Sequence, residues 1–172
     1  APLDSKNVLV GMSHLFVAGG ATSESERPIH IGGAYTVHTS AFPENLQYTA
    51  LGHLHRPQTL RKDSTSPIRY SGSPLGYSFS EAGQTKSVTI IEVEPQQAAA
   101  FEEIYLSSGR PLVKWRAKSL SEVEAWLEEG RDARAWIDLE LEVEQALTPE
   151  TIHRLRQAHD GLLNIRPIFK GK

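Results

Sequence analysis

The stretch YTALGHLHRPQ at residues 48–58 constrains this chain most, because a short apolar run stops at a glycine that is followed by two histidines. Tyr48 and Leu51 stand among few polar residues, as in a strand buried on both faces. Gly52 would let the backbone turn sharply as the strand ends. Alternate residues of an extended segment point to the same side, so His53 and His55 could face one point in space.

These histidines form a candidate metal site, because neutral imidazole is a common ligand of divalent transition metals. On spacing alone, a pair of loop histidines is the simpler interpretation. A further histidine, His14, follows a short apolar strand expected at residues 7–11. Ligands of layered α/β proteins gather outside strand ends, so His14 and His53 could border one crevice. Taken alone, His14 also fits a hydrogen-bonded histidine at the edge of a core.

Composition limits the class of protein. The 172 residues are 39% hydrophobic and 23% charged, which is typical of a soluble globular chain, and no apolar run approaches a bilayer span. The chain starts at Ala1 without a secretory signal pattern, so we expect a cytoplasmic protein. It has no cysteine, which excludes disulfides and thiolate ligands. The net charge of −3 argues against a broad basic surface, so any nucleic-acid site must be local.

Beyond the histidines, the first part of the chain predicts more strands and turns. We expect a loop over residues 18–34 that leads into a strand near 29–31, an exposed hairpin loop at 61–67 and strands at 68–70 and 87–93. The small residues at 71–74 predict a turn. Pro95 interrupts the strand pattern, and the sequence after it has no apolar period, so residues 95–100 are expected to be a linker between two domains.

Residues 101–172 alternate between strand and helix patterns. Strands are expected at 104–106, 112–115, 134–143 and 162–169, the third with its acidic residues on a half-exposed face. Ser119 with Glu122 three residues later predicts a capped helix start, and Thr148 before Pro149 predicts another. This order favours a small open sheet with helices packed on it. Three tryptophans in this part could form a stacking platform for bases, although burial in the small core explains them more simply: Trp115, Trp126 and Trp136.

Several motifs together indicate a family. They are GHLH after a buried strand, RYSGSP at 69–74, FSEAG at 79–83, SHLFV at 13–17 and SERPIHIG at 25–32. In these motifs the chain resembles the second half of SbcD-like nuclease subunits, which belong to the calcineurin-like metallophosphoesterases. The resemblance covers most of residues 7–94. The Asp-x-His, bridging Asp and Asn-His-Asp motifs of the family's opening half are absent from these 172 residues.

The resemblance implies an α/β fold. Residues 1–94 would be the second half of a metallophosphoesterase β-sandwich, and residues 101–172 a small α/β capping domain that faces DNA. His14 and His53 would bind one Mn²⁺ ion and His55 a second. A group of residues would lie beside the substrate: Arg69, Ser71, Gly72 and Ser73. The remaining ligands would come from the absent half, so we expect this chain alone to be inactive.

The resemblance also implies a function for the parent protein. It would be a manganese-dependent exonuclease and endonuclease acting on double-stranded DNA ends and hairpins in DNA repair and recombination. It would form a homodimer, work with an SbcC-type ATPase subunit and have no membrane segment. Two alternatives stay open from the residues: another calcineurin-like phosphoesterase, and a noncatalytic module that contacts DNA or a partner protein.

Overall fold

The computed structural model describes residues 6–26, 36–61 and 66–169. It divides into two compact units, residues 1–80 with 84–108 (unit 1) and residues 81–83 with 109–172 (unit 2). The strand expected at 29–31 and the tip of the hairpin loop expected at 61–67 lie outside the described residues. Among the described helices, none is both long and apolar enough to cross a membrane.

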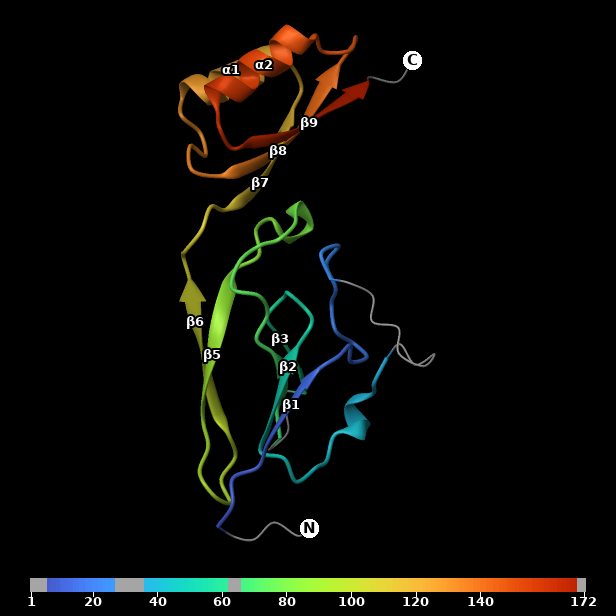
Figure 1. Cartoon of the computed structure of the whole chain (residues 1–172), viewed down its shortest axis with the longest axis vertical. Coiled ribbons are helices and arrows are strands. Elements are labelled where there is room, and N and C mark those ends of the chain that lie inside the picture. Colours follow the sequence, from blue (N-terminus) through green and yellow to red (C-terminus); the bar gives the residue numbers. More distant parts are fainter. Residues whose placement is uncertain (1–5, 27–35, 62–65, 170–172) are drawn as a thin grey trace. The chain divides into compact units, whose positions relative to one another are not determined.

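The first sheet of unit 1 contains four strands in the order β1-β2-β4-β3. Figure 1 labels β1, β2 and β3 of this sheet. They are β1 Val10–His14, β2 Tyr48–Gly52, β3 Gln58–Arg61 and β4 Ile68–Tyr70. β1, β2 and β4 are parallel, and β3 is antiparallel to β4. The predicted buried strand at 48–51 is confirmed. The strand expected at 7–11 begins later, so that His14 is its last residue.

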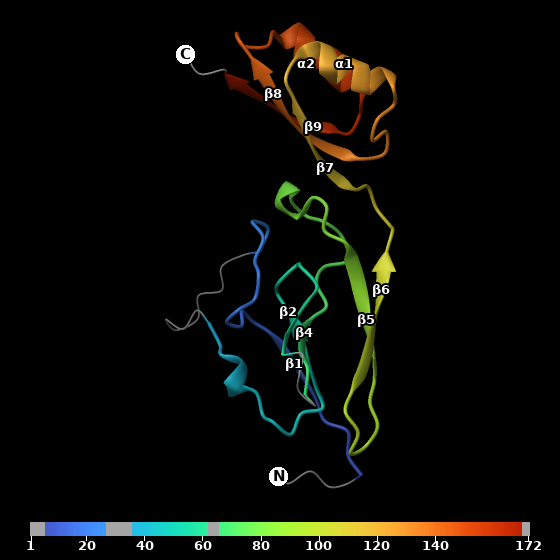
Figure 2. The same ribbon diagram turned by 180° about the vertical axis from the view of Figure 1, so that it is seen from behind.

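The second sheet of unit 1 is the hairpin of β5 Lys86–Glu92 and β6 Ala100–Leu106 (Figure 2). Its strands pair in register from Lys86 opposite Leu106 to Glu92 opposite Ala100. Residues 95–99 of the linker expected at 95–100 therefore lie in the loop of this hairpin, Ala100 begins β6, and unit 1 extends to Ser108. Pro95 does end a strand, but a turn follows in which Gln97 N–H donates to the Glu94 carbonyl and Gln96 has a φ of 64°.

Unit 2 is a parallel three-stranded sheet in the order β7-β8-β9, with both helices on one side (Figure 1). Its elements are β7 Leu112–Ala117, α1 Leu120–Glu128, β8 Trp136–Val143, α2 Pro149–Ala158 and β9 Leu162–Phe169. The predicted helix starts are confirmed, because Ser119 and Thr148 each accept a hydrogen bond from a backbone N–H three residues later. The predicted alternation of strand and helix is confirmed as well.

A closed core joins the helices of unit 2 to one face of its sheet. The buried cluster draws on every element of the unit: Trp115, Ala117, Val123, Ala135, Ile137, Leu139, Leu141, Leu155 and Leu162. Trp126 packs against this cluster, with its ring centroid 5.3 Å from that of Trp115. The core interpretation is confirmed for Trp115 and Trp126. Trp136 is half-buried, and the Arg110 guanidinium lies 4.3 Å from its ring centroid.

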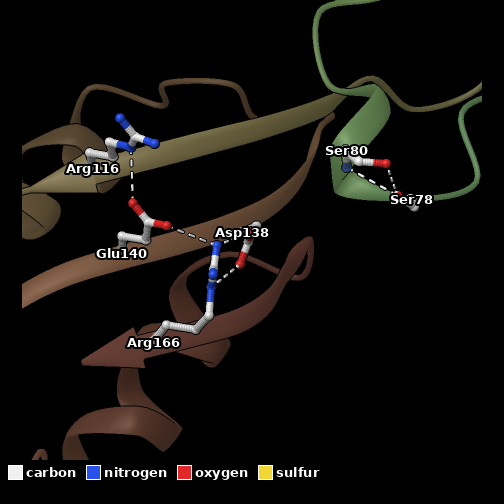
Figure 3. Close-up of polar contacts among 6 residues, drawn as sticks. All are labelled: Ser78, Ser80, Arg116, Asp138, Glu140 and Arg166. Atoms are coloured by element: carbon white, nitrogen blue, oxygen red, sulfur yellow. Dashed lines mark hydrogen bonds and ion pairs between the residues drawn. The ribbon is translucent and has the colours of Figure 1, made fainter. Parts of the chain in front are cut away.

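A row of charges lies across the three strands of unit 2 (Figure 3). Arg166 on β9 forms a fork with Asp138 on β8, with N–O distances of 2.9 and 2.5 Å, and also pairs with Glu140 at 3.1 Å. Glu140 pairs in turn with Arg116 on β7 at 2.9 Å. Asp138 was expected on a half-exposed face, yet it is only 4% exposed. The bidentate ion pair with Arg166 offsets the desolvation of the Asp138 carboxylate.

Candidate functional site

His14 lies at the carboxyl end of β1, and its register partner in the parallel strand β2 is Gly52. Because the strands are parallel, both chains leave the sheet at the same edge. A Cβ atom on Gly52 would lie 2.8 Å from His14 Nδ1, so a glycine at this position gives the imidazole its space. The sequence suggested that Gly52 makes the turn itself. The positive φ, however, is that of the next residue, His53.

His53 has a φ of 107°, a backbone conformation that residues other than glycine rarely adopt. Such a conformation costs on the order of 1–3 kcal/mol. Its ring lies beside that of His14, with centroids 5.5 Å apart and planes at 70°. The structure therefore brings together two of the three predicted metal ligands, from neighbouring strand ends. We call residues 52–55 the histidine turn.

His55, the third predicted ligand, has different neighbours. Its ring stands edge-on to Tyr77 with centroids 5.3 Å apart, and its Nδ1 lies 2.7 Å from Ser25 Oγ. The sequence argument assumed an extended segment in which His53 and His55 point to the same side. The positive φ of His53 breaks that alternation, so the two rings have different closest partners.

The backbone of His55 is held on both sides. Its N–H donates to Glu26 Oε1 at 2.8 Å. Its carbonyl accepts from the Ser73 N–H and from Lys86 Nζ, each at 3.0 Å. These bonds fix the histidine turn against segments that are distant in the sequence.

The turn at residues 71–74 was expected beside a substrate, and the structure places part of it against the histidine turn. Gly72 has a φ of 81°, and a Cβ atom there would lie 2.7 Å from the Pro57 ring. Ser73 is buried and binds the His55 backbone, whereas Ser71 is exposed. Ser73 thus holds the histidine turn through the His55 backbone, and Gly72 packs against Pro57, two residues after that turn.

Arg69 does not fit the expectation of a residue beside the substrate. Its side chain is buried and donates to Thr59 Oγ1 at 2.7 Å and to Thr89 Oγ1 at 3.2 Å. It also forms an ion pair with Glu103 on β6. Arg69 therefore joins the two sheets of unit 1, and these contacts are with residues outside the histidine turn.

Four residues near the histidine turn were not singled out from the sequence: Ser25, Glu26, Tyr77 and Lys86. Ser25 and Glu26 stand in the motif at 25–32, so the family resemblance already pointed to their segment. Lys86 gave no signal, because nothing in the sequence around it predicts that a lysine would be 8% exposed and bound to a backbone carbonyl.

The charge environment favours a neutral His53. Burial lowers the pKa of His53 below its usual value, and the nearby His14 lowers the pKa further. The carboxylate of Glu26 opposes this shift, and His55 adds a smaller lowering. Only the neutral imidazole has a lone pair for a metal. Within residues 6–26, 36–61 and 66–169, no group of three or more His, Cys, Asp or Glu side chains is arranged to hold a metal ion.

Comparison with known proteins links the chain to a nuclease. The chain is 57% identical over 164 residues, or 95% of its length, to the SbcD subunit of the nuclease SbcCD from Bacillus subtilis (strain 168). The chain is similar to the C-terminal part of that SbcD protein. It spans 42% of the length of this relative. No protein-family model matches the chain.

The region of identity to SbcD includes nearly the whole chain, and so both structural units. The expectation drawn from five short motifs is thereby supported over the full sequence. The similarity concerns the C-terminal part of SbcD, which agrees with the absence of the family's opening motifs from these residues.

Proposed function

We propose that this chain is the C-terminal portion of an SbcD-like nuclease subunit. In this proposal unit 1 is the second half of a metallophosphoesterase domain, and unit 2 is its capping domain. The observation that carries the proposal is the meeting of His14 and His53 at two neighbouring strand ends, in a chain 57% identical to an SbcD protein.

The histidines fit part of a metal site. His14 and His53 would hold one Mn²⁺ ion, and His55 would contribute to the other. Bound ions would supply electrostatic stabilisation of the attacking and leaving oxygens of a phosphodiester. Imidazoles bring no negative charge, so the carboxylates that usually accompany such ions must come from residues outside this set. We therefore propose that this chain alone is inactive.

The parent protein would be a manganese-dependent exonuclease and endonuclease on double-stranded DNA ends and hairpins. It would act as a homodimer with an SbcC-type ATPase. The name of the SbcCD relative supports the SbcC partner subunit. Unit 2 would face the DNA. Its sheet offers few cations for phosphate contacts, because Arg116 and Arg166 are paired with carboxylates, so loop or helix residues would have to supply them.

The proposal is tested in the complete protein by replacing the histidines singly and together. We expect His53→Ala and His55→Ala each to remove most Mn²⁺-dependent hydrolysis of a double-stranded DNA end while the melting temperature changes little. The double variant should be about as inactive as either single one, because both ions act in one displacement. His153→Ala, on the exposed face of α2, is the matched control.

Two results would contradict this function. One is substantial manganese-dependent activity in the His55→Ala enzyme. The other is a loss of activity that follows a loss of thermal stability in every variant. Calorimetry on the 172-residue chain adds an independent test, since submicromolar Mn²⁺ binding that His53→Ala abolishes would show a complete site within this chain.

A further inference from the structure

His53 has a backbone conformation that needs support from its surroundings. Its φ of 107° lies between two fixed points, because Leu51 before it and Leu54 after it are 3% and 1% exposed. Such a conformation persists only where neighbouring contacts impose it. On the C-terminal side, the hydrogen bonds of His55 add to the burial of Leu54.

The carboxylate of Glu26 links two backbone segments. Its Oε1 accepts the N–H of His55 at 2.8 Å, and its Oε2 accepts the N–H of Ser23. One oxygen therefore closes the turn that contains Glu26, while the other holds a residue 29 positions later in the chain. Hydrogen bonds to an ionised acceptor are shorter and about twice as strong as those between neutral groups.

The two sides of the His55 backbone differ in how many groups support them. Three donors bind its carbonyl, namely the Ser73 N–H, the Ser73 hydroxyl and Lys86 Nζ, so loss of the lysine contact leaves the Ser73 bonds in place. The amide side depends on the Glu26 carboxylate. Glu26 is thus the side chain whose replacement should most directly change the geometry of the histidine turn.

We propose that Glu26 is a positioning residue: its carboxylate keeps His53 at positive φ and so keeps the His53 ring beside His14. The assignment rests on the proposed function only in taking His53 as a metal ligand. The backbone role can be tested without metal or DNA, so its failure and the failure of the proposed function give different results.

The first experiment is nuclear magnetic resonance on the metal-free 172-residue chain. In Glu26→Gln, only one of the two N–H groups keeps an oxygen acceptor, and even an amide oxygen that turns toward the His55 N–H lacks the negative charge. We expect hydrogen-exchange protection of the His55 amide to fall by at least about tenfold, as for a lost charge-assisted bond. The ring-to-ring Overhauser contact between His14 and His53 should weaken.

The matched control is Glu24→Gln. Glu24 is exposed. Its backbone N–H donates to Ser80 Oγ at 3.0 Å, and a change of side chain keeps this donor. This variant makes the same change of charge two residues away and should leave both signals unchanged. If Glu26→Gln also leaves them unchanged, the proposal is wrong.

A second experiment separates backbone strain from general stability. Glycine tolerates a positive φ, whereas alanine does not. Glu26→Gln should raise the unfolding equilibrium constant of unit 1 by about tenfold in the native and His53→Ala backgrounds. In the His53→Gly background, where no strain needs support, the increase should be about threefold or less.

This cycle stays decisive if Glu26→Gln alone fails to fold. In that case the double variant with His53→Gly should recover a folded unit 1, and the double variant with His53→Ala should not. Equal effects of Glu26→Gln in all three backgrounds would show that Glu26 stabilises the unit without positioning His53, and would overturn the assignment.

Discussion

Unit 2 buries most of its apolar residues in one core and exposes Leu163, Ile168 and Phe169 on β9, whereas unit 1 leaves more of its large apolar residues exposed. Each parallel connection of unit 2 is a helix that covers one face of its sheet. Unit 1 also contains parallel strands, but its described residues include only two short 3-10 helices besides strands and loops. Parallel sheets normally have both faces covered. Unit 2 covers one face of its sheet with its own helices, whereas the described residues of unit 1 contain no α-helix, which indicates that unit 1 depends more on further protein surface than unit 2 does.

The exposed side chains of unit 1 show where cover is lacking. Val88 on β5 lies directly opposite Ile104 on β6, and these residues are 44% and 42% exposed. Ile90 on the same face is 48% exposed. At the edge of the other sheet, Met12 on β1 is 84% exposed. Contiguous apolar surface of this kind is typical of an interface.

The largest effect is expected when the two units are expressed as separate fragments. We expect residues 109–172 to give a monomer that melts cooperatively, because their core cluster is closed. Residues 1–108 should melt at a lower temperature and aggregate more readily, because of the apolar faces and the open edge strand β1. Size-exclusion chromatography and circular-dichroism melts of both fragments measure this. A monomeric, cooperative 1–108 fragment beside a disordered 109–172 fragment would reverse the comparison.

A core truncation in unit 2 should have the next largest effect. Leu139 is fully buried in the middle of β8, so Leu139→Ala should destabilise unit 2 by about 2–5 kcal/mol. All three tryptophans of the chain lie in unit 2, so fluorescence during urea unfolding follows this unit alone. Gln157→Ala on the exposed side of α2 should change little. A shift below about 1 kcal/mol for Leu139→Ala would show that this core is not tightly packed.

In unit 1, a polar anchor is expected to matter more than any single apolar contact. The Tyr70 hydroxyl accepts the Val17 N–H at 2.9 Å and donates to the Leu15 carbonyl at 2.8 Å. Tyr70→Phe leaves both backbone groups without this partner and should cost about 1–3 kcal/mol. Native-state hydrogen exchange of β2 and β4 amides measures the loss.

Tyr105→Phe is the control for that substitution, because Tyr105 is 68% exposed. The tryptophan-reported unfolding of unit 2 should not move in either variant. If Tyr70→Phe lowered the unfolding free energy of both units equally, the two units would unfold together and would not differ in stability.

The smallest expected effect is a pH dependence confined to unit 1. Burial and His14 lower the pKa of His53 in the folded state. His53 therefore binds a proton more readily in the unfolded chain than in the folded one. Its contribution to the stability of unit 1 is fully present above about pH 6.5 and decreases as the pH falls below that value. Melting curves of the metal-free chain between neutral and mildly acidic pH should show it, and His53→Gln should remove it. An unchanged pH profile in His53→Gln would assign the effect to other groups.

Local patterns in the sequence predicted most of unit 2. The alternation in β8, the capping residues Ser119 and Thr148 and the two helices all depend on neighbours within a few residues, and all are confirmed. The exception is Asp138, whose burial depends on Arg166 in another strand. Sequence alone could not predict that pairing, because it requires the register of β8 with β9.

In unit 1 the sequence by itself determined the buried strand β2, the strand β4 and the histidines as candidate ligands. Tertiary structure decided which of them meet. The register of β1 with β2 places His14 against Gly52, and the positive φ of His53 turns one ring toward His14 while His55 turns toward Tyr77. It also decided that β6 belongs to unit 1, that Arg69 is buried and that Glu26 binds the histidine turn. These outcomes depend on contacts between segments far apart in the chain, which local propensity and spacing do not specify.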